Sequence, residues 1–375
     1  MKSVFNTNNK KSTLDCKIFL DDQNNGISML RFDQLKYPKI QKFREIQESF
    51  FWRPMEIELQ KDQRDYKSLT DAGKHIFRSN ILFQTMLDSV QTIAPSVLFS
   101  TITTLPEVLN FCAIWQFQES IHSFSYSYIL RNVLNDPSEL FDQTLEIKEI
   151  VERANSITKY YDDLYHYNQY VDLFGYDKDH TKYEHKKKIW LALMTANLLE
   201  GVRFYVSFAC SWAFAEQKLM IGNATEIKFI CKDENIHLGF TQYLLKTLPK
   251  DDPDFITISQ ELENECINMF IEAVDQEKEW AKYLFKHGSI LGLNERLLSD
   301  YIEWIAKKRM DSIGLKCPWK TSVDNPLPWT QNWISGKDVQ QAQQEGEGDR
   351  YLIGALDKSK DKRDILKHIK KFELE

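Results

Sequence analysis

The sequence predicts an all-α protein, a helical bundle that holds two metal ions in its core. Glycine is scarce, at 13 of 375 residues, which favours long helices over a turn-rich β fold. Apolar residues recur three and four positions apart over long stretches, as they do on the buried face of a helix. Two of these stretches carry the pattern Glu-x-x-His, and each follows an apolar stretch that carries a core-facing acid. This repeated arrangement is the strongest signal in the chain.

The first of these acids lies in the N-terminal part of the chain. Residues 1–30 are polar and are expected to be irregular. The spacing predicts an amphipathic helix over residues 40–51, and Pro54 ends it because proline cannot donate a backbone hydrogen bond. A second helix is predicted over residues 71–90. Asp88 shares a face of this helix with apolar residues, so it is an acid aimed at the core.

The third predicted helix carries the first Glu-x-x-His pair. Its start is marked by Thr104 as the N-cap, Pro106 in the first turn and Glu107 at the capping-box position. It is expected to end near residue 132, before an Asn-Asp-Pro break. Residues three or four apart share a helix face. One such stripe is apolar except for a carboxylate, an imidazole and a phenol, and it consists of Cys112, Trp115, Glu119, His122 and Tyr126.

The second acid and the second pair follow in the next helices. Helices are predicted over residues 145–170 and over a long apolar stretch from residue 189 onward. Glu200 lies on one face of this stretch, flanked by aromatic residues. The helix predicted over residues 223–246 carries Glu234 and His237. The order acid, then Glu-x-x-His, is therefore repeated.

The C-terminal part divides into helices and a tail. Amphipathic helices are predicted over residues 258–286 and 294–313, and an irregular proline-containing stretch follows. After residue 335 the composition becomes polar, with almost nothing to bury, which is typical of a flexible linker. We therefore expect one helical domain over residues 1–336 and a separate flexible tail over residues 337–375.

The repeated pattern predicts a dinuclear metal site. One Glu-x-x-His pair is what chance provides, and each residue taken alone is as readily a surface acid or a capped core histidine. Two helical hairpins with matching acids would instead aim four carboxylates and two imidazoles at one bundle centre. Burying uncompensated carboxylates is costly, and two divalent cations would balance their charge. The predicted ligands are Asp88, Glu119, His122, Glu200, Glu234 and His237.

Composition and charge argue against several other functions. The formal net charge of −7 and the pI of about 5.7 oppose a general attraction to nucleic acid or to acidic membranes. The 6 cysteines are scattered without a C-x-x-C pattern, which indicates a reducing compartment. The chain starts without a hydrophobic leader, and we find no run of about eighteen apolar residues. We expect a soluble cytoplasmic protein that binds neither nucleic acid nor membrane.

Several motifs together resemble one enzyme family. They are FFWRP, LDS at residues 87–89, ESIHSFSYSYILRN, LLEGVRFYVSFAC and FICKDENIHL. In order and spacing they resemble the radical-generating small (β) subunit of class I ribonucleotide reductase, of the NrdB type, over nearly the whole chain. The resemblance implies a ferritin-like helical bundle with additional helices, a homodimer, and two iron ions joined by an oxide bridge.

The same resemblance implies roles for individual residues. Tyr126 would become a stable radical when the diferrous site reacts with O₂. An apolar pocket that shields this radical would be formed by Phe204, Phe208 and Ile230. One iron would be held by Asp88, Glu119 and His122, and the other by Glu200, Glu234 and His237.

The resemblance also implies a partner. The radical would travel through His122, Asp233, Trp52 and the tail residue Tyr351 to a cysteine of a separate large subunit, where ribonucleotides are reduced. The sequence contains no phosphate-binding loop of the P-loop or dinucleotide type, so the substrate is expected to bind elsewhere. The tail over residues 337–375 would then dock on the large subunit.

Some residues depart from the family, and other functions use the same ligands. Phe124 and Ser120 stand where well-known bacterial relatives carry arginine and threonine, so the surroundings of the radical differ. Because Tyr126 is present and the first ligand is Asp88, we favour iron, although manganese is possible with these donors. The alternatives are a ferritin-type iron-binding protein, which has no use for Tyr126 or Tyr351, and a stand-alone diiron oxidase, which needs an open cavity beside the metals.

Overall fold

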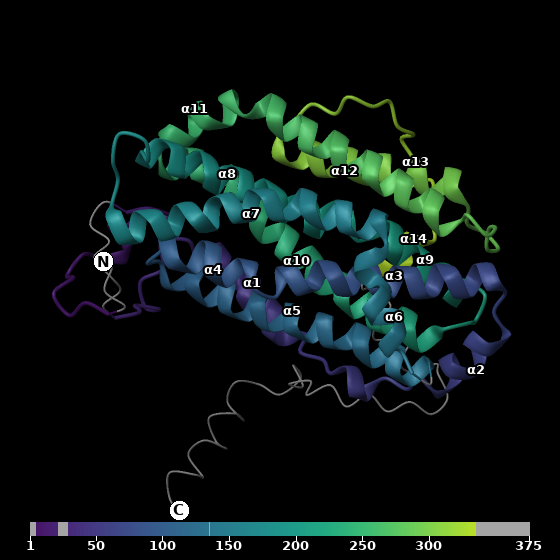
Figure 1. Ribbon diagram of the computed structural model, residues 1–375. Coiled ribbons are helices and arrows are strands. Elements are labelled where there is room, and N and C mark those ends of the chain that lie inside the picture. The colour runs from purple at the N-terminus through teal and green to yellow at the C-terminus, as the bar shows by residue number, and fades with distance from the viewer. Residues whose placement is uncertain (1–4, 22–28, 135, 335–375) are drawn as a thin grey trace, which may run out of the picture.

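The computed structural model describes residues 5–21, 29–134 and 136–334, and within these ranges it is a bundle of α-helices without a β-strand (Figure 1). The predicted all-α bundle is confirmed. The predicted tail, including Tyr351, lies outside the described residues. The long helices run side by side along the molecule. Those that position the candidate site are α3 (Asp71–Gln91), α5 (Pro106–Val133), α8 (Lys182–Leu198), α9 (Tyr205–Glu216) and α10 (Ile221–Asp251).

The beginning of α5 differs from the prediction. The N-cap is Leu105 rather than Thr104, and no side chain caps this helix, although Pro106 does occupy its first turn. Glu107 does not reach back to its own helix end. Its Oε1 instead accepts a hydrogen bond of 2.8 Å from the backbone N–H of Tyr37, at the start of α1 (Pro38–Ser49). A buried carboxylate has thus satisfied the free N–H of a neighbouring helix, and the predicted capping box is wrong.

The long apolar stretch that carries Glu200 is not one continuous α-helix. Between α8 and α9 the chain forms a π-helix, Leu199–Arg203, which is a wider turn. Gly201 lies in this turn, where an added Cβ would come within 2.9 Å of Leu238 Cδ1 on α10. The glycine therefore allows the π-helix and α10 to approach closely, next to the second Glu-x-x-His pair.

The remaining long helices cover this core. They are α1, α7 (Lys148–Phe174), α12 (Glu263–Leu284) and α13 (Glu295–Ile313). The helix predicted over residues 258–286 is interrupted at Leu262, which separates α11 (Asp254–Glu261) from α12. The two stay nearly continuous, because the Leu262 N–H still donates to the Ile258 carbonyl at 2.9 Å. The described ranges also contain short α-helices, namely α2 (Gln60–Ser68), α4 (Ala94–Phe99), α6 (Ser138–Asp142) and α14 (Thr330–Ile334).

One segment has the length and composition of a membrane span. It covers Lys182–Glu216, that is α8, the π-helix and α9, and 94% of its apolar window is buried inside the protein. The central helix of a bundle passes the same test, so the finding is weak support for a membrane-spanning role. Its burial is what a position in the core requires.

Candidate metal centre and its surroundings

Two overlapping groups of acidic and imidazole side chains lie in the middle of the bundle. Within each group, one ligand atom from every residue lies within 4.8 Å of the others. All of these side chains are fully buried. Glu119 and Glu234 belong to both groups, so either carboxylate would be within reach of two metal ions. The first group is Asp88, Glu119, His122 and Glu234, and the second is Glu119, Glu200, Glu234 and His237.

Four separate segments deliver these ligands, and together they are the six residues predicted from the sequence. Each Glu-x-x-His pair occupies one helix, α5 or α10, where residues three apart share a face. Asp88 lies in the last turn of α3. Glu200 lies in the π-helix, so a wider turn presents its carboxylate to the group.

The electrostatics of this cluster fit two bound cations. Burial and the charge of Glu119 raise the pKa of Asp88 well above its usual value, and burial with Glu119 and Glu200 does the same for Glu234. Several carboxylate oxygens have no hydrogen-bond partner in the described ranges, including both oxygens of Asp88. Buried oxygens of this kind need a charge partner, which a divalent ion supplies. A donor set of oxygens and imidazole nitrogens suits iron or manganese better than zinc or copper.

Both histidines turn the same ring nitrogen toward the carboxylates. The Nδ1 atom of His122 lies 3.1 Å from Glu234 Oε1, and the Nδ1 atom of His237 lies 2.9 Å from Glu234 Oε2. Their Nε2 atoms point away from the cluster, to Asp233 and Gln118 respectively. Burial disfavours the charged form of His122, yet hydrogen bonds to Asp233 and Glu119 raise its pKa to about 10. A bound metal ion would take the place of the Nδ1 proton.

Comparison with known proteins decides the family. The family model "Ribonucleotide reductase, small chain" matches residues 30–326. The chain belongs to the small-chain family of ribonucleotide reductase. The "Ribonucleoside-diphosphate reductase subunit beta" of Haemophilus influenzae is 44% identical to it over 350 residues, which cover 91% of this chain and 93% of the relative. The chain is therefore a β subunit of this oxidoreductase, and it works with a large subunit.

Solved structures agree with this assignment. The ribonucleotide reductase R2 subunit from Clostridium botulinum matches with a TM-score of 0.76 and 28% identity. The match covers 89% of this chain and 98% of the Clostridium botulinum chain. The dimanganese(II)-NrdF structure from Streptococcus sanguinis matches with a TM-score of 0.65 over 82% of this chain and 99% of that one. At 20% identity, the second match supports the fold alone. The predicted family and the ferritin-like fold are confirmed.

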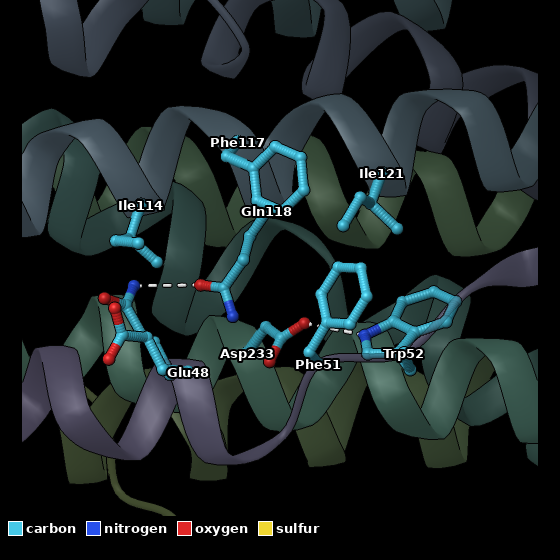
Figure 2. A pocket seen from close by; sticks show the side chains of 9 residues that line it. Glu48, Phe51, Trp52, Ile114, Phe117, Gln118, Ile121 and Asp233 are labelled. Atoms are coloured by element: carbon cyan, nitrogen blue, oxygen red, sulfur yellow. Dashed lines mark hydrogen bonds between the residues drawn. The ribbon is translucent and has the colours of Figure 1, made fainter. Parts of the chain in front are cut away.

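Three of the four residues predicted to carry the radical, Trp52, Asp233 and His122, are in contact. The indole Nε1 of Trp52 donates to Asp233 Oδ2 at 2.9 Å, and Nε2 of His122 lies 3.2 Å from the same oxygen. The ring of Trp52 also stacks over that of His122, with centroids 6.2 Å apart. Figure 2 shows Trp52 and Asp233 at the edge of a cavity of about 250 Å³. The fourth residue, Tyr351, lies outside the described part of the chain.

Tyr126 lies beside the metal ligands and away from solvent. It is 0% exposed, and its hydroxyl interacts with the buried carboxylate of Asp88. Burial, followed by the charges of Asp88 and Glu234, raises its pKa well above the usual value. The predicted shielding residues Phe204, Phe208 and Ile230 are each 0% exposed, within the same apolar core. Phe204 and Phe208 stack on each other, with centroids 5.5 Å apart.

The sequence did not predict the side chains that donate hydrogen bonds to the metal-ligating carboxylates. Gln91 donates to Glu200 and accepts a 3.0 Å hydrogen bond from the hydroxyl of Tyr161, a residue of the tyrosine-rich helix α7. Trp115 donates from its indole to Glu119 at 2.9 Å. Trp115 could have been found, because it stands one helical turn before Glu119 on the predicted stripe. Gln91 and Tyr161 carry no such signal, since their contacts join different helices.

Proposed function

We propose that this small chain generates and stores a tyrosyl radical and passes it to a large subunit, which reduces ribonucleotides to deoxyribonucleotides. The observation that carries the proposal is the position of a fully buried phenol, Tyr126, beside a cluster of six buried metal-ligating side chains. Neither iron storage nor oxidation of an external substrate needs a phenol in that position. The ligand cluster alone would suit all three functions.

The proposed cofactor is a pair of iron ions joined by an oxide bridge. Asp88 and His122 would bind one ion and Glu200 and His237 the other, with Glu119 and Glu234 within reach of both. When bound, the metal pair supplies the oxidising power obtained from O₂. Manganese stays possible, because the donors suit it equally and the structurally similar protein from Streptococcus sanguinis is described as a dimanganese(II) protein.

The protein's own part is to control the proton and to exclude water. Oxidation of Tyr126 to a radical removes one electron and one proton from the phenol. The carboxylate of Asp88, whose charge acts on the phenol, is the base in position to receive the proton. The side chains of Phe204, Phe208 and Ile230 are proposed to keep water and reductants away, which would lengthen the lifetime of the radical.

The proposed exit route begins at His122. Asp233 accepts from both His122 and Trp52 through the same oxygen, so it can hold the indole proton while an electron moves along the chain. From Trp52 the radical would pass to Tyr351 in the tail. We propose that residues 1–336 form the radical-generating domain and that residues 337–375 dock on the large subunit.

The exposed face of α5 supports a homodimer. Phe117 and Phe124, seven residues apart on this helix, are 49% and 46% exposed. Small side chains, such as Ser120, alternate with them along the same stripe. A stripe of aromatic and small residues suits close packing against the same helix of a second copy. The expected cytoplasmic location, without nucleic acid or membrane as partner, is kept as part of the proposal.

Electron paramagnetic resonance tests the proposed function. The purified chain is loaded with Fe(II) without oxygen and then exposed to O₂. We expect the spectrum of an organic, protein-based radical, because the buried phenol of Tyr126 is protected from reduction. Tyr126→Phe should bind and oxidise the same amount of iron but give no such signal. If the wild type oxidises two irons per chain and never shows the radical, the proposal fails in favour of storage or a stand-alone oxidase.

A further inference from the structure

The two predicted ligand histidines are supported by different kinds of side chain. The Nε2 atom of His122 lies 3.2 Å from a carboxylate oxygen of Asp233. The Nε2 atom of His237 lies 2.9 Å from the amide oxygen of Gln118. Asp233 belongs to the predicted radical route, whereas Gln118 has no assigned role. It is 5% exposed and lies on α5, one residue before Glu119.

A second donor fixes the orientation of each supporting oxygen. Gln47, on α1, donates from Nε2 to the Oε1 of Gln118 at 2.9 Å. Trp52, just after α1, donates from Nε1 to the Oδ2 of Asp233 at the same distance, 2.9 Å. The amide oxygen of Gln118 is therefore an acceptor, and the hydrogen between it and His237 belongs to the imidazole. Nδ1 faces the carboxylates of Glu119, Glu200 and Glu234, so a bound metal ion would replace its hydrogen while Nε2 keeps the hydrogen shared with Gln118.

The aromatic contacts of the His237 ring do not determine its tautomer. The ring packs against Trp115, with centroids 5.3 Å apart, and edge-on against Phe111 at 6.5 Å. These aromatic neighbours restrict the tilt of the ring but do not select which nitrogen carries the hydrogen. A carboxylate that accepts from imidazole N–H increases the basicity of the other nitrogen more than a neutral amide does. The two imidazoles are consequently unequal donors.

We propose that Gln118 is a positioning residue that holds His237 in its metal-binding tautomer and that makes the Glu200/His237 half of the centre the weaker of the two. This inference rests on the proposed metal centre, and it adds an order of affinity within that centre. Gln118 also lines the cavity of about 250 Å³ described above, and its Oε1 contacts both Gln47 and His237. Loss of its acceptor oxygen should release His237 alone.

The test is a titration of the metal-free, full-length chain with Mn(II), followed by electron paramagnetic resonance. The wild type should bind two ions with unequal affinities and give the spectrum of a coupled pair. Gln118→Leu keeps the size of the side chain but removes the acceptor, and it should weaken one of the two ions by roughly 10–100-fold. The spectrum should then be that of an isolated ion at a ratio of one per chain.

Two further variants separate positioning from a general structural effect. Gln118→Glu keeps an acceptor oxygen and adds charge, so it should retain two ions with affinities that are closer together. Gln116→Leu, at a partly exposed position of the same helix, should behave as the wild type. If Gln118→Leu binds both ions with wild-type affinity, or loses both equally, the inference is overturned.

The metal centre and the inference can fail separately. Two ions bound by the wild type support the centre whatever the variants do, whereas a wild type that binds none removes both. Should Gln118→Leu fail to fold by circular dichroism, Gln47→Leu replaces it. That variant removes the donor that orients Gln118, so it must weaken one ion selectively, and an unchanged titration would reject the role of Gln118.

Discussion

Four of the six metal-facing side chains have a contact on their far side, and the chemistry of that contact differs from ligand to ligand. Glu119 accepts from an indole and Glu200 from an amide, whereas His122 and His237 contact a carboxylate and an amide oxygen. Asp88 has no such partner for its oxygens in the described ranges. It is also the ligand whose charge acts most on Tyr126. The least restrained carboxylate thus lies next to the proposed radical.

For single residues, the sequence pattern predicts only which side chains lie close together on one helix. Glu119 with His122, and Glu234 with His237, are three residues apart, so helical periodicity brings each pair together. The supporting contacts join residues that are far apart in the chain, with a separation of 119 positions for Gln118 and His237 and of 181 for Trp52 and Asp233. Periodicity carries no information about such pairs, and for Trp52 and Asp233 the family resemblance supplied the prediction.

The proposed exit route predicts a specific defect in Trp52→Phe. The indole donates to Asp233 and stacks over His122, but Trp52 is not one of the six metal-ligating side chains. We therefore expect two bound irons and a normal Tyr126 radical, with nearly all turnover lost in the presence of the large subunit. Trp304→Phe, on α13, is the matched control and should keep turnover. A variant at Trp52 that turns over normally would remove this residue from the route.

At the scale of elements, the π-helix is the part that neither composition nor spacing predicts. A π turn differs from an α turn by a shifted hydrogen-bond pattern, which apolar periodicity does not encode. Its anchors are tertiary contacts. The guanidinium of Arg203, the last residue of the π-helix, donates to Ser156 on α7 at 2.9 Å and lies 3.7 Å from Glu277 on α12. Helices of the outer layer therefore hold the turn that presents Glu200.

Glu277 is central to this anchor, and its substitution should be costly. The side chain is 0% exposed and lies between two buried arginines, Arg203 and Arg153, the second of which packs over the ring of Phe83. Glu277→Gln would leave two buried cations without an anion. Removing one member of a buried ion pair costs about 3–5 kcal/mol. We expect a lower midpoint of urea unfolding, measured by circular dichroism on the metal-free chain.

The control for that variant is a neighbour on the same helix. Glu279 is an exposed residue whose pairing with Lys282, at 3.5 Å, is open to solvent. Exposed pairs of this kind contribute little, at most about 1 kcal/mol. Glu279→Gln should therefore leave the midpoint nearly unchanged. Equal effects of the two substitutions would show that the buried triad does not anchor the π-helix.

In the whole molecule, the helices surround four buried carboxylates whose negative charge calls for bound cations. The sequence predicted this centre well, because four acids repeated in register can be buried together only with cations. It predicted the supporting layer less well, because the positions of α1, α7 and α12 follow from packing between helices. The ligands come from four segments that lie far apart in the chain, so bound ions would tie the entire core together.

This arrangement predicts opposite effects of Asp88→Asn on the metal-free and metal-loaded chain. Without metal, repulsion among the buried carboxylates opposes folding, and burial raises the pKa of Asp88. Replacing the acid by an amide should therefore raise the melting temperature of the chelator-treated protein. With metal, the wild type gains stability because the folded chain binds the ions, about 4 kcal/mol at a thousandfold excess over Kd. Differential scanning fluorimetry with and without Fe(II) or Mn(II), under nitrogen, should show that the variant has lost most of this gain.

Asp275→Asn, at an exposed position of α12, should change neither melting temperature. A variant at Asp88 that is less stable than the metal-free wild type would mean that this carboxylate serves packing rather than metal binding.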